Sequence, residues 1–492
     1  MQGLLSRHTD VGRGFLFITG AKVYFLATAT LTTPIFPRLF GDPAAYGGFR
    51  VVSGILNVIT MVVITASVQA ASKLASEAQV DIAKVRSVGM KVQALVFGTV
   101  FLAAFALSGP IASQGLDDPA LEPPLRVASL VVAAYAAYAL LVGVINGTKR
   151  FALQAGLDVT FSTLKTASMV AVVALTASAT WAFAAFALSA FTVLALALLA
   201  TRSLPTGGRP VTARRFVAYL LPLAGYALTL NLLLQADVIA LKAAFGRNGP
   251  EVASSIAGIY GAARNAALLP YQVVISLTFV VFPLVSRATS QGDHAGAAGA
   301  ASSALRLASI LSAFSVAVFG AAPSELLTLL FGKDYGTAGH VFVPLLFASG
   351  LTAAMYVGNA ILASAGRPNA SMAGAALAVA VQVFLLCFLT AGSMEDAHTT
   401  AAMATLSGSG AGAVVTLSLL RRVAPLASWL WTLVASALAA AASIAVTHAL
   451  SHQLPWPALF LGAGVIFIVA AVLLRAVDRS DLARVRRAFE RR

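Results

Sequence analysis

The chain has 492 residues, of which 59% are hydrophobic and only 10% are charged, and its formal net charge is +15. Soluble domains carry about a quarter charged residues, so this composition excludes an ordinary soluble protein. The single Cys387 lies within an apolar run, which excludes a disulfide framework and a cysteine-based metal site.

Long apolar runs separated by short polar breaks predict an all-α integral membrane protein with about fourteen transmembrane helices. Most of the runs are long enough to cross roughly 30 Å of hydrocarbon. The expected limits, in chain order, are 14–36, 46–72, 92–113, 127–147, 151–178, 181–201, 216–243, 252–286, 300–322, 338–364, 368–391, 399–420, 428–450 and 455–475. The division after residue 178 is the least marked, because almost nothing polar separates the two runs there.

The positions of the basic residues predict the orientation of these spans. With the N-terminus in the cytoplasm, about 24 Lys and Arg residues fall on the inner side and 5 on the outer side, namely Arg38, Arg126, Lys242, Arg247 and Lys333. This asymmetry follows the positive-inside rule and places both termini in the cytoplasm. Orientation and contact with anionic membrane lipids therefore account for the basic excess. Nucleic-acid binding is not expected, because no basic patch is interleaved with stacking aromatic residues.

Two short patterns recur along the chain and predict an internal duplication. Tyr46–Arg50 and Tyr260–Arg264 share the pattern Tyr-Gly-x-x-Arg, and Lys149–Gly156 parallels Arg367–Gly374 at nearly the same offset. An even number of spans in each repeat predicts parallel repeats with a binding site between the two lobes. The expected organisation is a six-helix lobe over 1–205, a second six-helix lobe over 206–423, two additional helices over 424–476 and a basic cytoplasmic tail over 477–492.

Four cations are expected inside the spans, and they are Lys22, Arg50, Lys165 and Arg264. A charged side chain at the centre of a bilayer costs about 2.5–3.5 kcal/mol on insertion scales, so such residues usually serve a function. Because the cations outnumber the acids in the spans, we expect an anionic substrate. Arginine suits phosphate in particular, through paired and planar hydrogen bonds.

Several charges in the spans, including those of the acids Asp158 and Asp237, also have a structural alternative, whereas Lys22 and Arg264 lie too deep in their spans to reach an interface easily. Arg50 lies near the outer end of its span and could extend its guanidinium to the interface. Asp158 and Lys165 are seven residues apart on one helix, about 10 Å, and could neutralise each other through neighbouring helices. Asp237 is close to an outer end and could be structural. If the protein were instead a cation-coupled multidrug exporter, Asp158 and Asp237 would be the expected ion-coupling residues.

Prolines and glycines in the spans indicate possible gates. Pro270 lies in the long eighth span, and Pro222 and Gly225 lie in the seventh. Proline removes a backbone hydrogen bond and bends a helix, so these positions predict gating kinks, with ordinary packing bends as the alternative. No catalytic set, metal-ligand spacing or nucleotide-binding loop is present, so we expect neither an enzyme nor a cofactor nor a metal.

Several of these segments resemble a known superfamily. Tyr260–Arg264 with Leu268–Pro270 and Phe282–Arg287 resembles the eighth helix of lipid II flippases (MurJ type) and of SpoVB-like proteins. Ser67–Ala78 is similar to the end of the SpoVB-like second helix, and Leu330–Tyr335 resembles a segment of polysaccharide-repeat flippases (Wzx type). All belong to the multidrug/oligosaccharidyl-lipid/polysaccharide exporter superfamily, whose fold is two six-helix lobes around a central cavity.

The resemblance implies roles for three of the cations. Arg264 matches the eighth-helix arginine of the lipid II flippases, Arg50 matches their second-helix arginine, and Lys22 lies where they have a first-helix arginine. In that family these cations engage the pyrophosphate of the lipid carrier, and two extra C-terminal helices form a groove for its polyprenyl tail. Gly20-Ala21-Lys22 lacks the Arg-Asp pair usual in lipid II flippases, which favours a surface-polysaccharide substrate and leaves lipid II as the alternative.

The expected function is thus that of a flippase in a bacterial inner membrane. It would move an undecaprenyl-pyrophosphate-linked oligosaccharide, such as an O-antigen repeat unit of lipopolysaccharide, by alternating access. Arg264, Lys22 and Arg50 would hold the pyrophosphate, with Lys165 in support. The expected partners are the lipid-linked saccharide, membrane lipids and the polysaccharide polymerase machinery.

Overall fold

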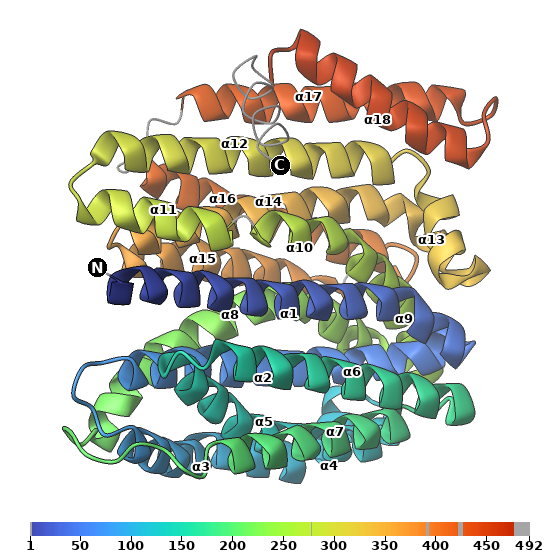
Figure 1. Cartoon of the computed structure of the whole chain (residues 1–492). Helices are drawn as coiled ribbons and strands as arrows, with labels where there is room; N and C mark the ends of the chain where they lie inside the picture. The colour runs from blue at the N-terminus through green and yellow to red at the C-terminus, as the bar shows by residue number, and fades with distance from the viewer. Residues whose placement is uncertain (1, 277, 390–392, 422–426, 477–492) are drawn as a thin grey trace. The chain divides into compact units, whose positions relative to one another are not determined.

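The computed structural model describes residues 2–276, 278–389, 393–421 and 427–476 (Figure 1). Regular structure in these residues is helical, apart from one isolated bridge between Val80 and Arg209. The prediction of an all-α fold is therefore confirmed. The predicted basic tail over 477–492 lies outside the described residues.

The chain divides into two compact units, Met1–Gly258 and Ile259–Arg492, which are treated separately below. The helices up to the division are α1 (Gln2–Phe40), α2 (Pro43–Ala75), α3 (Ile82–Ala106), α4 (Ser108–Pro110), η1 (Ile111–Gly115), η2 (Pro119–Leu121), α5 (Glu122–Gly147), α6 (Phe151–Thr176), α7 (Ala179–Ala200), α8 (Ala213–Phe245), η3 (Gly246–Asn248) and α9 (Pro250–Ala267), within which the division falls. The predicted lobe boundary follows residue 205, whereas this division comes later because α8 packs along α2.

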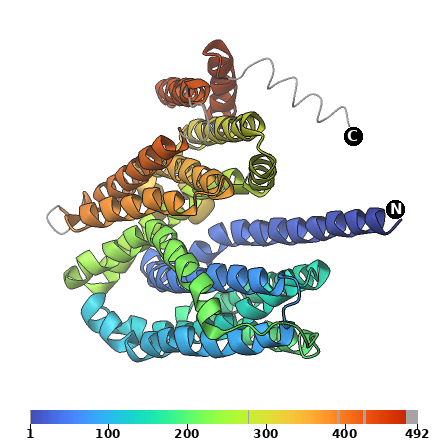
Figure 2. The same cartoon turned by 90° about the vertical axis from the view of Figure 1, so that its left-hand side faces the viewer.

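The second unit continues with helices from Leu269 onward. They are α10 (Leu269–Ser276), α11 (Thr278–Ser290), α12 (His294–Phe319), α13 (Pro323–Phe331), η4 (Lys333–Ala338), α14 (Gly339–Ser364), α15 (Pro368–Leu386), α16 (Ala397–Leu420), α17 (Ala427–Leu450) and α18 (Trp456–Leu473). Figure 2 shows the helices of both units from the perpendicular direction.

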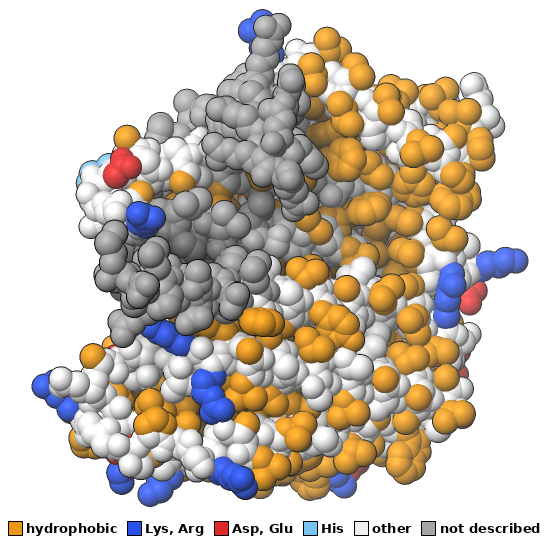
Figure 3. Space-filling view, viewed as in Figure 1, with side chains coloured by type: hydrophobic (Ala, Val, Ile, Leu, Met, Phe, Trp, Pro, Cys, Tyr) orange, Lys and Arg blue, Asp and Glu red, His pale blue; other side chains and the backbone are white. Residues whose placement is uncertain are grey.

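The predicted spans coincide with helices. Among the described residues, 11 helices are long and apolar enough to cross a membrane. The predicted spans 14–36, 252–286 and 368–391 correspond to α1, to α9 through α11, and to α15, which are outside those 11, so the count of fourteen remains a prediction. Hydrophobic side chains are spread widely over the described part of the face seen in Figure 3.

Local sequence signals explain where α2 begins and how it packs. Asp42 caps the helix by accepting a 2.8 Å hydrogen bond from the N–H of Ala45, and Pro43 occupies the first turn, where its missing N–H leaves no hydrogen bond unmade.

Further along α2, Gly143 and Gly147 of α5 form a Gly-x-x-x-Gly pair against it. An added Cβ on either glycine would lie 2.6–2.7 Å from α2 backbone oxygens, so only glycine permits this close approach.

A second close approach involves the first Tyr-Gly-x-x-Arg pattern. An added Cβ on Gly47 of α2 would lie 1.7 Å from the carbonyl oxygen of Ser254 in α9. Gly258 faces the same crossing, where its added Cβ would lie 2.3 Å from the carbonyl oxygen of Pro43. The glycine of this pattern therefore serves helix packing within the first unit.

The substitution Gly47→Ala is expected to destabilise the protein. The methyl group must displace backbone, and overpacking of this kind costs about 1–3 kcal/mol. The melting temperature of the purified protein checks this. Gly98→Ala is the control, because no atom lies within 4 Å of its added Cβ. Equal melting temperatures for the two variants would contradict the tight crossing.

Hydrogen bonds between side chains connect the helices of the second unit. Thr352 of α14 pairs with Ser409 of α16 at 2.9 Å. The indole N–H of Trp429 in α17 donates to the hydroxyl of Ser309 in α12 at 3.0 Å, and Trp429 is fully buried. The additional helix α17 is thereby fixed to α12, and α18 packs on both of them.

The linker between α7 and α8, residues 201–212, is attached to the turn between α2 and α3. Arg209 donates its N–H to the carbonyl of Gln79 at 2.6 Å, and the N–H of Asp81 donates to the carbonyl of Arg209 at 3.1 Å. These bonds form the isolated bridge. The linker is therefore held at Arg209, which only three residues separate from α8.

The eighth predicted span is interrupted where its proline predicts. Helix α9 ends at Ala267 and α10 begins at Leu269, so Pro270 lies in the first turn of α10. Since Pro270 has no N–H, the carbonyl of Ala266 receives no hydrogen bond from it. The break comes one turn after Arg264.

Candidate functional site

The contact between α1 and α6 brings two of the predicted charged residues together. Lys22 and Asp158 interact electrostatically across this contact. The hydroxyl of Tyr138 in α5 also donates to Asp158 Oδ1 at 3.2 Å. Lys22 is therefore the cation that interacts with Asp158, and the alternative in which Asp158 neutralises Lys165 is not supported.

Polar groups continue along the same seam. The hydroxyl groups of Tyr24 and Thr163 are 2.8 Å apart, and those of Thr28 and Ser162 are 2.6 Å apart. Hydroxyl groups that satisfy one another can be kept inside an apolar helix bundle at little cost. The seam thus provides a polar stripe between α1 and α6.

Lys165, which is two turns beyond Asp158 on α6, lies among aromatic rings. Its ammonium nitrogen is 5.2 Å from the ring centre of Phe25, 5.9 Å from that of Phe161 and 5.3 Å from that of Phe186. Each such contact contributes roughly 0.5–2 kcal/mol, depending on desolvation. In the described part of the chain no carboxylate lies within 4.0 Å of this ammonium group.

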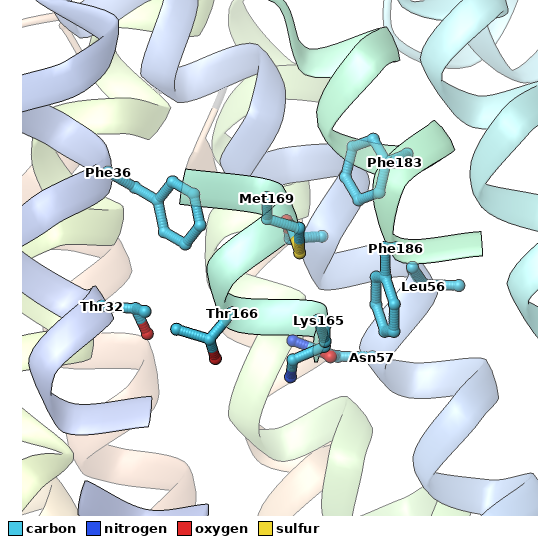
Figure 4. A pocket seen from close by; sticks show the side chains of 10 residues that line it. Thr32, Phe36, Leu56, Asn57, Lys165, Thr166, Met169, Phe183 and Phe186 are labelled. Atoms are coloured by element: carbon cyan, nitrogen blue, oxygen red, sulfur yellow. The ribbon is translucent and has the colours of Figure 1, made fainter. Parts of the chain in front are cut away.

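Lys165 lines a cavity of about 130 Å³ in the first unit (Figure 4). The other polar groups that line it are Thr32 of α1, Ser53 and Asn57 of α2, and Thr166 of α6. The apolar lining includes Phe36, Phe183 and Phe186. In Figure 4, the α1 side chains Thr32 and Phe36 stand on one side of Lys165 and the α7 rings on the other. The cavity combines one cation, neutral hydrogen-bonding groups and phenyl rings.

Arg50 is buried rather than extended to the surface. It is only 3% exposed, and its Nη2 donates to Gln235 Oε1 of α8 at 2.9 Å. The alternative in which Arg50 reaches the interface is therefore wrong for this structure. The structure does not place Arg50 among the residues that line the Lys165 cavity.

Arg264 lies in the second unit and is fully buried. Its Nη1 donates to the hydroxyl of Ser349 in α14 at 3.3 Å. Tyr260, one turn earlier on α9, has its ring centre 6.0 Å from that of His398, which in turn is 6.3 Å from the ring of His340. Arg264 thus belongs to a polar and aromatic group formed by α9, α14 and α16.

The remaining predicted residues lie on α8. Asp237 is fully buried, and its Oδ1 accepts a 2.9 Å hydrogen bond from the N–H of Val238. Pro222 lies inside the helix, and Gly225 has open space where a Cβ would point. The gating role of Pro222, Gly225 and Pro270 and the ion-coupling role of Asp237 remain predictions.

Lys242 was expected on the outer side and proves to be a buried residue at the end of α8. Its ammonium group donates to Asp118 Oδ2, to the carbonyl of Pro250 and to the hydroxyl of Ser254, each at 2.7 Å. These three bonds use all three donors of the lysine. The cluster joins η2, α8 and α9 within the first unit. Within the described residues, no group of three or more His, Cys, Asp or Glu side chains could hold a metal ion.

Residues 35–339 match a family described as "Polysaccharide biosynthesis protein", which is more than half of the chain. The chain belongs to this family. Together with the 11 long apolar helices in the described part of the chain, this makes the protein a membrane protein of polysaccharide biosynthesis.

Solved structures share the fold at low sequence identity. One described as "Lipid II flippase MurJ, inward closed conformation" matches with a TM-score of 0.71 and 12% identity, over 94% of this chain and 99% of that one. An inward-facing multidrug resistance MATE family transporter matches with a TM-score of 0.63 and 13% identity, over 81% and 94%. The eukaryotic MATE transporter AtDTX14 matches with a TM-score of 0.57 and 15% identity, over 89% and 98%. The comparison with curated proteins finds no match.

The family match agrees with the predicted place in polysaccharide biosynthesis, and the fold is the one shared by the MurJ and MATE structures. The long apolar helices make the chain a multi-pass integral membrane protein. Asn57 and Thr166, which belong to the neutral lining of the cavity, and the burial of Lys242 are not apparent from the sequence. The sequence does indicate one aromatic neighbour of Lys165. Phe161 precedes it by four residues and therefore lies on the same helix face.

Proposed function

We propose that the protein is a flippase for an undecaprenyl-pyrophosphate-linked oligosaccharide, the repeat unit of a surface polysaccharide such as an O-antigen. It carries this substrate from the inner to the outer leaflet of a bacterial cytoplasmic membrane by alternating access, and both termini are cytoplasmic. The observation that carries the proposal is Arg264, a fully buried arginine one turn before a helix break in a polysaccharide-biosynthesis transporter.

The proposal assigns the pyrophosphate to the buried cations. Arg264 offers the planar donor geometry that matches phosphate oxygens. From the resemblance to lipid II flippases, Arg50 and Lys22 are the further candidate contacts for the pyrophosphate. Keeping a guanidinium in a membrane span is costly, and binding of a pyrophosphate would explain why the chain retains it.

The polyprenyl tail is assigned to the apolar surface of the additional helices. Trp431 and Leu438 of α17 are 55% and 53% exposed, and Leu461 of α18 is 76% exposed. These exposed apolar side chains can contact either the hydrocarbon chains of lipids or a polyprenyl chain. The polymerase machinery that uses the exported repeat unit is the proposed protein partner.

Lipid II is the second candidate substrate. The fold match to the structure titled as a lipid II flippase covers 94% of this chain, but 12% identity supports the fold alone. A cation-coupled multidrug exporter is less favoured, because Asp158 pairs with Lys22 and so is not an uncompensated acidic site.

Deletion of the gene in the source organism tests the proposal. Lipid-linked sugars and surface polysaccharides are measured by mass spectrometry, with the wild-type gene on a plasmid as the control. Accumulation of an undecaprenyl-pyrophosphate saccharide together with loss of its surface polymer is the expected result. Lethality with accumulation of lipid II would transfer the assignment to peptidoglycan. An unchanged lipid-linked pool in a strain without a redundant flippase would overturn both.

A further inference from the structure

The Lys165 cavity contains one charge only among the residues that line it. Lys165 is the cation, and Thr32, Ser53, Asn57 and Thr166 are neutral. The lining therefore offers a single positive charge beside neutral hydrogen-bonding groups. A ligand that complements it carries one negative charge and several hydroxyl groups.

The neighbouring cations of the first unit do not add charge to this cavity. Lys22 interacts electrostatically with Asp158, so its positive charge is opposed by a carboxylate. Arg50 donates to Gln235 and is not a lining residue. Lysine is a compact point charge, whereas arginine has the planar fork that grips phosphate groups. The cavity is thus poorly matched to a pyrophosphate, which carries several charges.

The size and the walls of the cavity match a single sugar residue. One buried water takes about 10–15 Å³ by this measure of volume, so a cavity of about 130 Å³ holds on the order of ten small groups. The rings of Phe36, Phe183 and Phe186 supply broad apolar surfaces for the C–H face of a sugar ring. In the described residues no oxygen atom accepts a hydrogen bond from the Lys165 ammonium group, so its donors are available.

We propose that this cavity binds an acidic sugar of the transported saccharide, one that bears a carboxylate such as a hexuronic acid. The carboxylate pairs with Lys165, the hydroxyl groups of the sugar bond to Asn57 and the neighbouring threonines and serine, and its apolar face packs on the rings. This inference rests on the proposed saccharide substrate, and it narrows that substrate to acidic repeat units. It also separates sugar recognition at Lys165 from the pyrophosphate recognition assigned to Arg264.

Ligand-observed NMR on the purified full-length protein in lipid nanodiscs tests the proposal. The probes are sodium glucuronate, glucose as its neutral counterpart, and geranyl pyrophosphate as a short polyprenyl pyrophosphate. Glucuronate is expected to bind about tenfold or more tightly than glucose, since a hydrogen bond to a charged group is worth that factor.

Three variants locate the effect. Lys165→Met keeps the length of the side chain and removes its charge, so the preference for glucuronate is expected to disappear. Lys165→Arg keeps the charge and should restore at least part of the preference. Lys84→Met removes an exposed cation from α3 and should change nothing. Elution volume and melting temperature confirm that each variant is folded.

The outcomes separate this inference from the proposed function. Equal binding of glucuronate and glucose, or a glucuronate preference that survives in Lys165→Met, would overturn the acidic-sugar site. Loss of geranyl pyrophosphate binding in Lys165→Met would assign the cavity to the pyrophosphate instead and would also overturn it. A Lys165-dependent preference for glucuronate, with geranyl pyrophosphate failing to bind at all, would support the sugar site and count against the proposed lipid carrier.

Discussion

Export of the lipid-linked saccharide is expected to fall to the level of a deletion strain when Arg264 is replaced by alanine. The guanidinium is fully buried, and a charged hydrogen bond to phosphate is worth about 1.5–3 kcal/mol, which is roughly a tenfold to hundredfold loss for one contact. Two or more phosphate contacts would multiply that loss. Surface polysaccharide in a deletion strain carrying the variant measures the effect.

Arg264→Lys separates charge from geometry, because it keeps the positive charge without the planar fork. We expect partial export at best from this variant. Ser349→Ala is the matched structural control, since it removes the 3.3 Å hydrogen bond of Arg264 and leaves the guanidinium in place. Membrane levels of all variants are compared by immunoblotting. Full export by Arg264→Ala, or equal loss in Ser349→Ala, would show that Arg264 has a packing role instead.

Loss of Lys242 is expected to destabilise the protein more than loss of any exposed cation. The lysine is fully buried, and Lys242→Ala would leave the carboxylate of Asp118 buried without its counter-charge. Removing one partner of a buried ion pair costs about 3–5 kcal/mol. Replacing both partners, as in Lys242→Met with Asp118→Leu, should recover most of the stability, because no charge is then stranded. Thermal unfolding of the purified proteins measures both effects.

The pair formed by Arg126 and Glu122 provides a matched control in the same unit. Its side chains are 46% and 37% exposed, so water and salt screen the pair. Glu122→Gln should therefore change the stability by at most about 1 kcal/mol. If Lys242→Ala proved no more destabilising than Glu122→Gln, the Lys242 cluster would be solvated and would not be a buried ion pair.

The helices could be predicted from the sequence because a membrane span needs only length and apolarity, both of which are local properties. The limits 151–178 and 181–201 match α6 and α7, although little polar sequence separates them. The break in the eighth span was also predictable, since Pro270 removes a hydrogen bond wherever it is placed in a helix.

The partners of the charged residues could not be predicted in the same way. The spacing of Asp158 and Lys165 places them on one helix face, but the counter-charge of Asp158 comes from α1 and the rings around Lys165 come from α1, α6 and α7. Lys242 sits near the end of its span, and only the fold shows that η2 and α9 enclose it. Contacts between distant segments decide which buried charges are balanced.

The bridge between the α7–α8 linker and the turn after α2 limits how far the start of α8 can travel. From Arg209 to the first residue of α8, the only slack is residues 210–212, and an extended chain spans at most about 3.3–3.6 Å per residue. Four such steps separate Arg209 from Ala213, so this tether is at most about 13–14 Å long. A larger displacement of this end of α8 must either break the two main-chain hydrogen bonds or move the α2–α3 turn together with α8. The linker has twelve residues and could by its length be a free hinge. The bridge instead couples the start of α8 to the turn between α2 and α3.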